Sequence, residues 1–407
     1  MTDSLPPELI DSILSHLSGT PAIAECALVC HAWLPSARHH LLLPPKVLHL
    51  DQIQIAEFLH LIDSPRSTLS LVSFSTLHLA QNRVVIDWAN PAVPPDAEAW
   101  RKHTAVQDFL ARDSTFPPIT SLFLEWIDWR TLSPTALTSL HSSYKSVKEL
   151  ELRWIVFTKP ELCDLIAGLT ALEKITVGEG VPFDSASWTA DSVQMIHSSL
   201  CKLVFSYSPP LWIIQFFARA IRYTGGIVGV SIDISGHRQQ SKACGELLEA
   251  AGTSLRALKV QALYYNIPLS VDDAVALAEL FAFPRNTGLR EIELYGIGEI
   301  NLKLLLQGLK SNAKPNLRQL KLGLAYRDDL QKWTGNWVLA DETLSTMLLK
   351  EPKLILELPS FRSEPWSFNS EGTKAYESAY SLESFEEVKS LLPRTAERWK
   401  LEVEFRD

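Results

Sequence analysis

The sequence predicts an α/β protein in which short parallel strands alternate with helices, preceded by a small all-helical module. Three observations lead to this fold class. An apolar pattern typical of a short strand recurs at a nearly constant interval, and the segments between these strands carry apolar residues at helical spacing. Residues 1–43 lack the recurring strand pattern and show only helical patterns. We therefore expect one module, residues 1–43, followed by one array of strand–helix units, residues 44–407.

The composition restricts the class of protein further. The chain has 407 residues, of which 46% are hydrophobic and 21% charged, as is usual for globular proteins, so wholesale disorder is excluded. There are 38 Lys and Arg against 47 Asp and Glu, which gives a net charge of −9. Nucleic-acid binding needs a cationic face, so an acidic chain is a poor candidate for it.

The cysteines and apolar runs indicate a reducing compartment without membrane contact. The five cysteines form no disulfide framework and show no zinc-ligand spacing. The longest apolar stretch, residues 211–221, is too short to cross a bilayer, and the N-terminus lacks a basic region followed by an apolar run. We expect a cytoplasmic or nuclear protein.

Three short helices are predicted within the first module. Pro6-Pro7 begins the first, and Glu8 in its first turn suits the positive end of the helix dipole. Gly19 ends that helix, and Thr20-Pro21 begins the second. The third runs over residues 29–41. Such a small module cannot build a large core of its own, so a partner or the neighbouring repeat should cover its apolar faces.

The strands of the array follow the pattern apolar-x-x-apolar-x-apolar. From residue 119 onward it returns at spacings of 28, 25, 28, 27, 28, 34 and 28 residues, and such a period is typical of repeat proteins. The matches are Phe74-Leu77-Leu79, Ile119-Leu122-Leu124, Val147-Leu150-Leu152, Leu172-Ile175-Val177, Leu200-Leu203-Phe205, Ile227-Val230-Ile232, Leu255-Leu258-Val260, Leu289-Ile292-Leu294 and Leu317-Leu320-Leu322.

The segments between the strands are predicted to be helices, because their apolar residues recur three and four positions apart. The predicted stripes are Leu137 and Leu140 after Ser133-Pro134, Leu162 to Leu169 after Pro160, Cys244 to Ala251, Leu302 to Leu309 after Asn301, and Leu344 to Leu348 after Asp341.

Two insertions and a terminal segment interrupt or close the array. A Pro-rich insertion around residues 83–118 should hold a short helix near 100–111, and a polar insert covers 326–336. A capping segment is expected around 360–407. Within it, a helix should follow residue 381, and the alternating apolar residues of 399–405 predict a closing edge strand.

The array resembles a leucine-rich repeat of the longer variety, which implies a curved solenoid with parallel strands inside and helices outside. The resemblance is incomplete. That family has Asn or Cys three residues after the last strand leucine, and only Asn82 fits after Leu79. Ile155, Gly180 and Ala325 stand there elsewhere, so the turns after the strands should be irregular.

The first module resembles the F-box. The residues that carry the resemblance are Leu5-Pro6-x-Glu8-Leu9, Ile13-Leu14-x-x-Leu17 and Leu28-Val29-Cys30-x-x-Trp33. The continuation over residues 33–41 is similar to the version common in mushroom-forming fungi. Pro35 departs from the pattern and should kink the third helix.

This resemblance implies that the module binds the Skp-type adaptor of a cullin–RING ubiquitin ligase while the repeats hold a protein substrate. The implied adaptor-binding residues are Leu5, Pro6, Leu9, Ile10, Ile13, Leu14, Leu17, Leu28, Val29, Cys30 and Trp33. The alternative is that these residues only pack on the first repeat.

Outward-pointing strand residues are the candidates for substrate contact, because side chains alternate along a strand. Their charges alternate in sign, which favours a protein partner over nucleic acid. Trp126 and Trp154, 28 residues apart, either contact a partner or pack the turns. The candidates are Trp126, Trp154, Glu151, Arg153, Lys259, Glu293, Tyr295 and Lys321.

We predict no enzyme, catalytic residue, metal or cofactor. Cys163 and Cys244 lie on apolar helix faces, unlike a nucleophilic thiol. The glycines of 225–229 precede a strand, the reverse of the order in a phosphate loop, and His39-His40 has no further ligands at metal spacing. We expect a substrate adaptor of an SCF-type ubiquitin ligase. The alternative is a repeat scaffold without a ligase role, and a hydrolase has no residue constellation in its favour.

Overall fold

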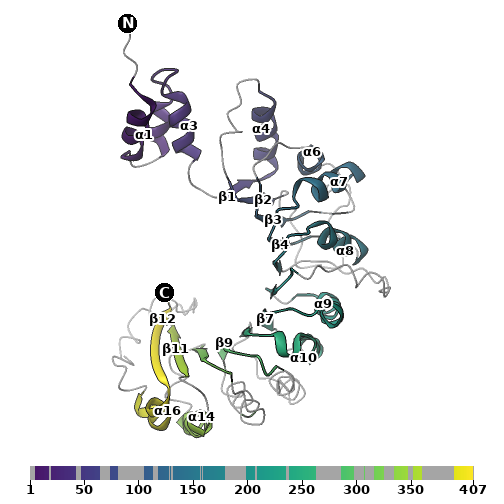
Figure 1. The fold of residues 1–407 in the computed structure, drawn as a ribbon, viewed down its shortest axis with the longest axis vertical. Coiled ribbons are helices and arrows are strands. Elements are labelled where there is room, and N and C mark those ends of the chain that lie inside the picture. Colours follow the sequence, from purple (N-terminus) through teal and green to yellow (C-terminus); the bar gives the residue numbers. More distant parts are fainter. Residues whose placement is uncertain are drawn as a thin grey trace, which may run out of the picture. The chain divides into compact units, whose positions relative to one another are not determined.

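The strands of this computed structural model lie in chain order, β1 to β12, in one sheet, which confirms the predicted α/β class (Figure 1). The pairings that its described residues define are all parallel. The structure describes residues 5–17, 20–42, 47–64, 74–80, 105–112, 118–127, 129, 132–155, 157, 159–178, 199–206, 209–234, 238–262, 286–297, 307, 316–324, 334–346, 352–359 and 389–406.

The chain divides into two compact units. The first contains residues 1–175 and 180–188, and the second contains 176–179 and 189–407. The division falls at strand β5 (Lys174–Val177), among the repeats. The change from helices to repeats near residue 43 lies inside the first unit.

The first module consists of α1 (Pro7–Ser15), α2 (Thr20–Cys26) and α3 (Leu34–Leu42). The kink predicted at Pro35 is wrong, because α3 begins at Leu34 and proline is tolerated in a first helical turn. A small core holds the three helices together. It consists of Ile10, Leu14 and Ala37, against which Leu17, Ile23, Cys26, Ala27 and Trp33 pack.

All nine strands predicted by the apolar period are present, and each begins two residues after the first apolar position. The inward leucines and isoleucines of successive strands are buried and form the core of the repeats. Besides β5, these strands are β2 (Thr76–Ala80), β3 (Ser121–Glu125), β4 (Glu149–Arg153), β6 (Lys202–Phe205), β7 (Gly229–Ile234), β8 (Ala257–Ala262), β9 (Glu291–Ile297) and β10 (Gln319–Leu324).

The period missed two strands, β1 (Val47–Leu50) and β11 (Lys353–Pro359). Their leucines pair in register with those of β2 and β10, but Pro45 and Glu351 stand at the first position of the pattern, where an apolar residue is expected. The predicted terminal strand is confirmed as β12 (Lys400–Arg406), parallel to β11 at the end of the strand order.

Among the described residues, the repeat helices of the first unit are α4 (Gln52–Asp63), α6 (Ala105–Ala111), α7 (Pro134–Ser143) and α8 (Lys159–Gly168), and α6 to α8 lie on one side of their strands (Figure 1). The Ser133 hydroxyl accepts a hydrogen bond from the Ala136 N–H at 3.2 Å, so Ser133 caps α7. Helix α6 confirms a helix within the Pro-rich insertion.

In the second unit, α9 (Leu211–Thr224) and α10 (Arg238–Ala251) lie on one side of β7 (Figure 1). The apolar stretch 211–221 is the buried face of α9. Gly225 and Gly226 end this helix with φ of 63° and 90°, which glycine adopts without strain, and the chain turns into β7 as predicted. Except for Gln307, the predicted stripe at 302–309 lies outside the described residues.

Before three of the strands, β4, β8 and β10, a polar side chain binds the preceding repeat, and we call these bonds the polar ladder. Ser146 donates to the Ile119 carbonyl at 2.9 Å, Ser254 to the Ile227 carbonyl at 3.0 Å, and Asn316 to the Thr287 carbonyl at 2.8 Å. Each of the three immediately precedes the first apolar residue of its repeat. This ladder makes the kind of bond that the expected Asn after the strand would have made.

The C-terminal cap joins α14 (Thr334–Thr346) to α16 (Pro393–Arg398). Asp341 was expected to precede a helix, and this prediction is wrong. Asp341 is buried inside α14, where its carboxylate accepts the Thr395 N–H at 2.7 Å and the Arg394 N–H at 3.3 Å. It therefore caps α16, a helix more than fifty residues later in the chain. The predicted helix residues 381–388 lie outside the described residues.

Candidate functional sites

An exposed set of apolar side chains covers the first module. Leu5, Leu9 and Ile13 recur every four residues at the start of the chain and along α1, and they are 45%, 51% and 43% exposed. Leu28 and Val29, between α2 and α3, are 85% and 65% exposed. Large apolar side chains in water mark an interaction surface when they gather in one small module. We call these five residues the apolar docking set.

The other predicted adaptor-binding residues divide by burial. Ile10 and Leu14 are 1% and 0% exposed in the core of the module, so they cannot contact a partner directly, and we remove them from the predicted surface. Leu17 and Trp33 are half-buried against the same core. Pro6 and Cys30 are exposed.

A ladder of rings crosses the sheet face of the first unit. His49 on β1, His78 on β2 and Phe123 on β3 are register partners. The His49 and His78 ring centroids lie 4.2 Å apart, and the His78 ring stacks on Phe123 at 3.8 Å. The Arg153 guanidinium lies 4.9 Å from the Phe123 ring centroid. Because these strands are adjacent and parallel, residues far apart in the sequence form one surface.

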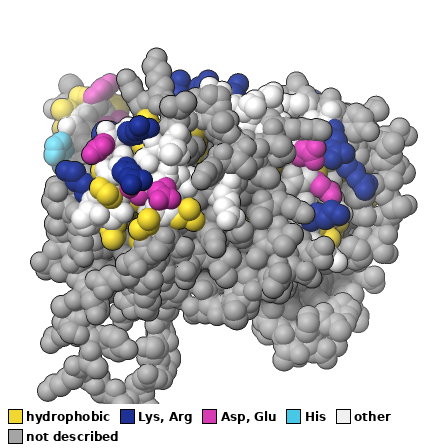
Figure 2. Space-filling view, turned by 90° about the horizontal axis from the view of Figure 1, so that it is seen from below, with side chains coloured by type: hydrophobic (Ala, Val, Ile, Leu, Met, Phe, Trp, Pro, Cys, Tyr) yellow, Lys and Arg dark blue, Asp and Glu magenta, His cyan; other side chains and the backbone are white. Residues whose placement is uncertain are grey.

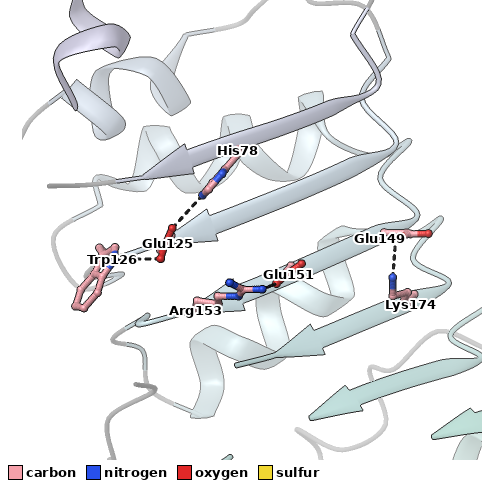
Figure 3. Close-up of polar contacts among 7 residues, drawn as sticks. All are labelled: His78, Glu125, Trp126, Glu149, Glu151, Arg153 and Lys174. Atoms are coloured by element: carbon pink, nitrogen blue, oxygen red, sulfur yellow. Dashed lines mark hydrogen bonds and ion pairs between the residues drawn. The ribbon is translucent and has the colours of Figure 1, made fainter. Parts of the chain in front are cut away.

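The carboxylates of this face are held in fixed pairs (Figure 3). Glu149 on β4 accepts a hydrogen bond from Lys174 on β5 at 2.9 Å, and Glu151 forms an ion pair with Arg153. Glu125 on β3 instead contacts His78 Nε2 at 3.1 Å and the Trp126 indole N–H at 3.2 Å.

Burial controls the charge of His78. Its side chain is 13% exposed, and desolvation, with the nearby His49 ring, lowers the pKa of His78 to about 4. Glu125 opposes this shift but does not overcome it. His78 is therefore neutral at pH 7, and to donate to Glu125 it must carry its proton on Nε2.

Trp126 and Trp154 occupy equivalent places at the ends of β3 and β4. Their rings stack with centroids 4.7 Å apart and planes 1° from parallel. Both residues have positive φ, 62° and 55°, which is rare for large side chains and costs on the order of 1–3 kcal/mol each. Trp126 is buried and Trp154 is half-buried, so Trp126 packs the turn and only Trp154 has appreciable exposed surface.

A second cluster lies on the sheet face of the second unit. The Tyr295 ring has the Lys259 Nζ at 4.6 Å and the Lys321 Nζ at 5.8 Å from its centroid, and its hydroxyl lies 3.2 Å from Glu293. Gly323 on β10 makes room for the ring, since a Cβ there would lie 2.5 Å from Tyr295. The structure thus brings four predicted candidates together.

Sequence reasoning missed His49, His78, Phe123 and Glu125. All four occupy outward strand positions. The alternation rule that selected Glu151 and Arg153 would have selected His78, Phe123 and Glu125 had it been applied before residue 149, but His49 lies on β1, which the apolar period missed. On the face shown in Figure 2, described Lys and Arg side chains lie close to described Asp and Glu side chains.

Two of the five cysteines are poor candidates for a nucleophile. Cys163 and Cys244 are buried, and burial raises the pKa of Cys163 to about 11 and that of Cys244 to about 12. Within the described residues, no group of three or more His, Cys, Asp or Glu could hold a metal ion. No described helix is long and apolar enough to span a membrane.

Comparison with known proteins places an F-box-like domain at the N-terminus. Residues 2–48 match the family model described as F-box-like. No curated protein matches the chain. A solved structure of the leucine-rich repeat-containing protein LegL7 from Legionella pneumophila is similar at 14% identity and a TM-score of 0.37, over 60% of this chain and 76% of that one. The class defined here is an F-box-like module followed by strand–helix repeats.

Proposed function

We propose that this protein is the substrate-recognition adaptor of an SCF-type ubiquitin ligase, acting in the cytoplasm or nucleus. The observation that carries the proposal is the F-box-like match of residues 2–48. F-box domains generally bind a Skp-type adaptor, and through it a cullin–RING ligase. Residues 33–41 further suggest kinship with the F-box proteins of mushroom-forming fungi.

The exposed apolar side chains support this role. Fully burying one Leu or Val is worth about 1.5–3 kcal/mol, and the apolar docking set leaves five large side chains in water. Docking on an adaptor would bury them. The repeats would then hold a protein substrate on the sheet face, and transfer of ubiquitin to it would become effectively intramolecular. This chain would perform no bond chemistry itself.

Binding to a purified Skp-type adaptor tests the proposal. We expect the full-length protein to bind at micromolar concentration or tighter. Leu28→Asp should weaken binding by about tenfold or more, because it places a charge in an apolar contact. The matched control is Val228→Asp, since Val228 is also exposed but lies outside the module. Equal binding by both variants, or no binding by the unmodified protein, would reject the proposal.

The same preparation separates the ligase role from the alternative. Pull-down from cell extract should recover both the adaptor and a cullin. Recovery of the adaptor without a cullin would favour a repeat scaffold that has no part in ubiquitination.

A further inference from the structure

Among the described residues of the first unit's sheet face, one carboxylate has no cation paired to it. The described outward positions of β1 to β4, with Lys174 of β5, carry three carboxylates and two cations. Lys174 pairs with Glu149, and Arg153 pairs with Glu151. Among these described residues, Glu125 has neither Lys nor Arg within ion-pair distance. Its register partner on β4 is Arg153, whose guanidinium is instead bound to Glu151 and lies over Phe123.

The two contacts of Glu125 orient its carboxylate without neutralising it. Oε2 lies 3.1 Å from His78 Nε2, and Oε1 accepts from the Trp126 indole at 3.2 Å. An indole N–H carries no charge, and His78 is neutral near pH 7. A carboxylate can accept about four hydrogen bonds, so each oxygen can accept a further donor. The side chain is 23% exposed, which leaves the carboxylate accessible to a partner.

Two aromatic residues adjoin this carboxylate in the chain. Phe123 precedes it by two residues on the same face of β3, and Trp126, whose indole N–H binds the carboxylate, follows it directly and stacks on the half-buried Trp154. Planar and long aliphatic cations bind well where a carboxylate lies beside aromatic rings, because the rings contact the stem or the guanidinium plane while the carboxylate compensates the charge.

We propose that Glu125, with the Trp126–Trp154 stack, binds a basic side chain, Arg or Lys, of the protein held by the repeats. This inference rests on the proposed substrate-adaptor function and specifies the chemistry of its recognition face. The bound cation supplies the one positive charge that the described part of this face lacks. Glu149 and Glu151 are already ion-paired, so they do not compete with Glu125 for the cation.

Fluorine NMR of the full-length protein labelled with 5-fluorotryptophan tests the proposal. The Trp126 and Trp154 resonances are assigned with Trp126→Phe and Trp154→Phe. The probes are N-acetyl-arginine amide, N-acetyl-lysine amide and the uncharged arginine isostere N-acetyl-citrulline amide. We expect a saturable shift of the Trp126 or Trp154 resonance with arginine, lysine or both, and none with citrulline. An equal response to citrulline, or no response to either cation, overturns the proposal even before Glu125 is substituted.

Two substitutions localise the effect. Glu125→Gln removes the charge but keeps an oxygen acceptor, and we expect it to weaken arginine binding by about fivefold, the size of an ordinary exposed ion pair. Glu149→Gln is the control, because this carboxylate on the same face already pairs with Lys174. Equal weakening by both variants, or unchanged binding by Glu125→Gln, also overturns the proposal.

The failure of this inference can be told from failure of the proposed function. Glu125→Gln should bind the Skp-type adaptor as well as the unmodified protein does, since the apolar docking set is untouched. If the adaptor is bound but no arginine response is seen, only the cation site is rejected. If arginine is bound at Glu125 but the adaptor is not bound, the cation site stands and the ligase role is rejected.

Discussion

The ionisation of His78 depends on the three side chains around it. His49 and Phe123 contact its ring from two neighbouring strands, and Glu125 holds its Nε2. Desolvation outweighs the attraction of the carboxylate, so the neutral ring is favoured. Burial likewise raises the pKa of Cys163 and Cys244, so both remain protonated thiols. For these three side chains, burial rather than residue type decides which protonation state is favoured.

His78 should make the protein sensitive to mild acid. The pKa of His78 is about 4 in the folded protein, against the ordinary histidine value of 6.5, so the unfolded state binds more protons between these values. The folded protein should therefore lose about 2 kcal/mol of stability as the pH falls from 7 to 5. Urea unfolding at both pH values should show a smaller loss in His78→Gln. Exposed His60→Gln is the control, and an equal loss in all three proteins would contradict the prediction.

Single elements of this fold are stabilised by polar groups supplied from other repeats. Ser146 and Ser254 bind carbonyls 27 residues earlier, and Asp341 caps a helix that comes much later in the chain. These bonds satisfy backbone groups that the repeat geometry would otherwise bury without partners. They replace the Asn ladder that the repeat pattern led us to expect.

The capping role of Asp341 can be measured through α16. Asp341→Ala leaves the buried Thr395 N–H and the part-buried Arg394 N–H without their acceptor, which should cost about 1–3 kcal/mol. Thermal unfolding should show the loss, and Asp341→Asn should recover part of it. Glu342→Ala, at the exposed neighbouring position, serves as the control and should change stability little.

The ladder before the strands has its own test. Ser146→Ala removes the bond to the preceding repeat and should destabilise the first unit by about 1 kcal/mol. Ser142→Ala removes only a hydroxyl bond to Ser139 within its own helix, so it should cost less. Chemical denaturation measures the free energy of unfolding of both variants. A larger loss of stability in Ser142→Ala than in Ser146→Ala would contradict the prediction.

Across the whole molecule, strand order follows chain order, so each repeat contacts chiefly its neighbours. Stability in such arrays is approximately a sum of repeat and interface contributions. A substitution that weakens one repeat should therefore destabilise only the repeats next to it.

Hydrogen exchange measures this distance. Asp341→Ala should increase exchange in β11 and β12, which adjoin the cap, and leave β2 to β4 of the first unit unchanged. Mass spectrometry of peptides from each strand provides the readout. Uniformly increased exchange from β2 to β12 would show that the chain unfolds as one cooperative body instead.

The outcome for particular residues shows what sequence reasoning can and cannot reach. The period found nine strands because two buried apolar residues per strand leave a local signal. It missed β1 and β11 because Pro45 and Glu351 break the pattern at one position. Ile10 and Leu14 were assigned to the adaptor surface because an apolar stripe does not reveal which of its residues the neighbouring helices cover.

The sequence by itself determined the α/β class, the repeat period and the helical module, because all three follow from local apolar spacing. Only the tertiary structure decided which apolar residues of the module stay exposed, which residue caps α16, and that Glu125 lies between His78 and Trp126 with no Lys or Arg of the described residues paired to it. Those outcomes depend on strands and helices that are distant in the chain but adjacent in space. Local apolar spacing does not show which distant residues become neighbours in the fold.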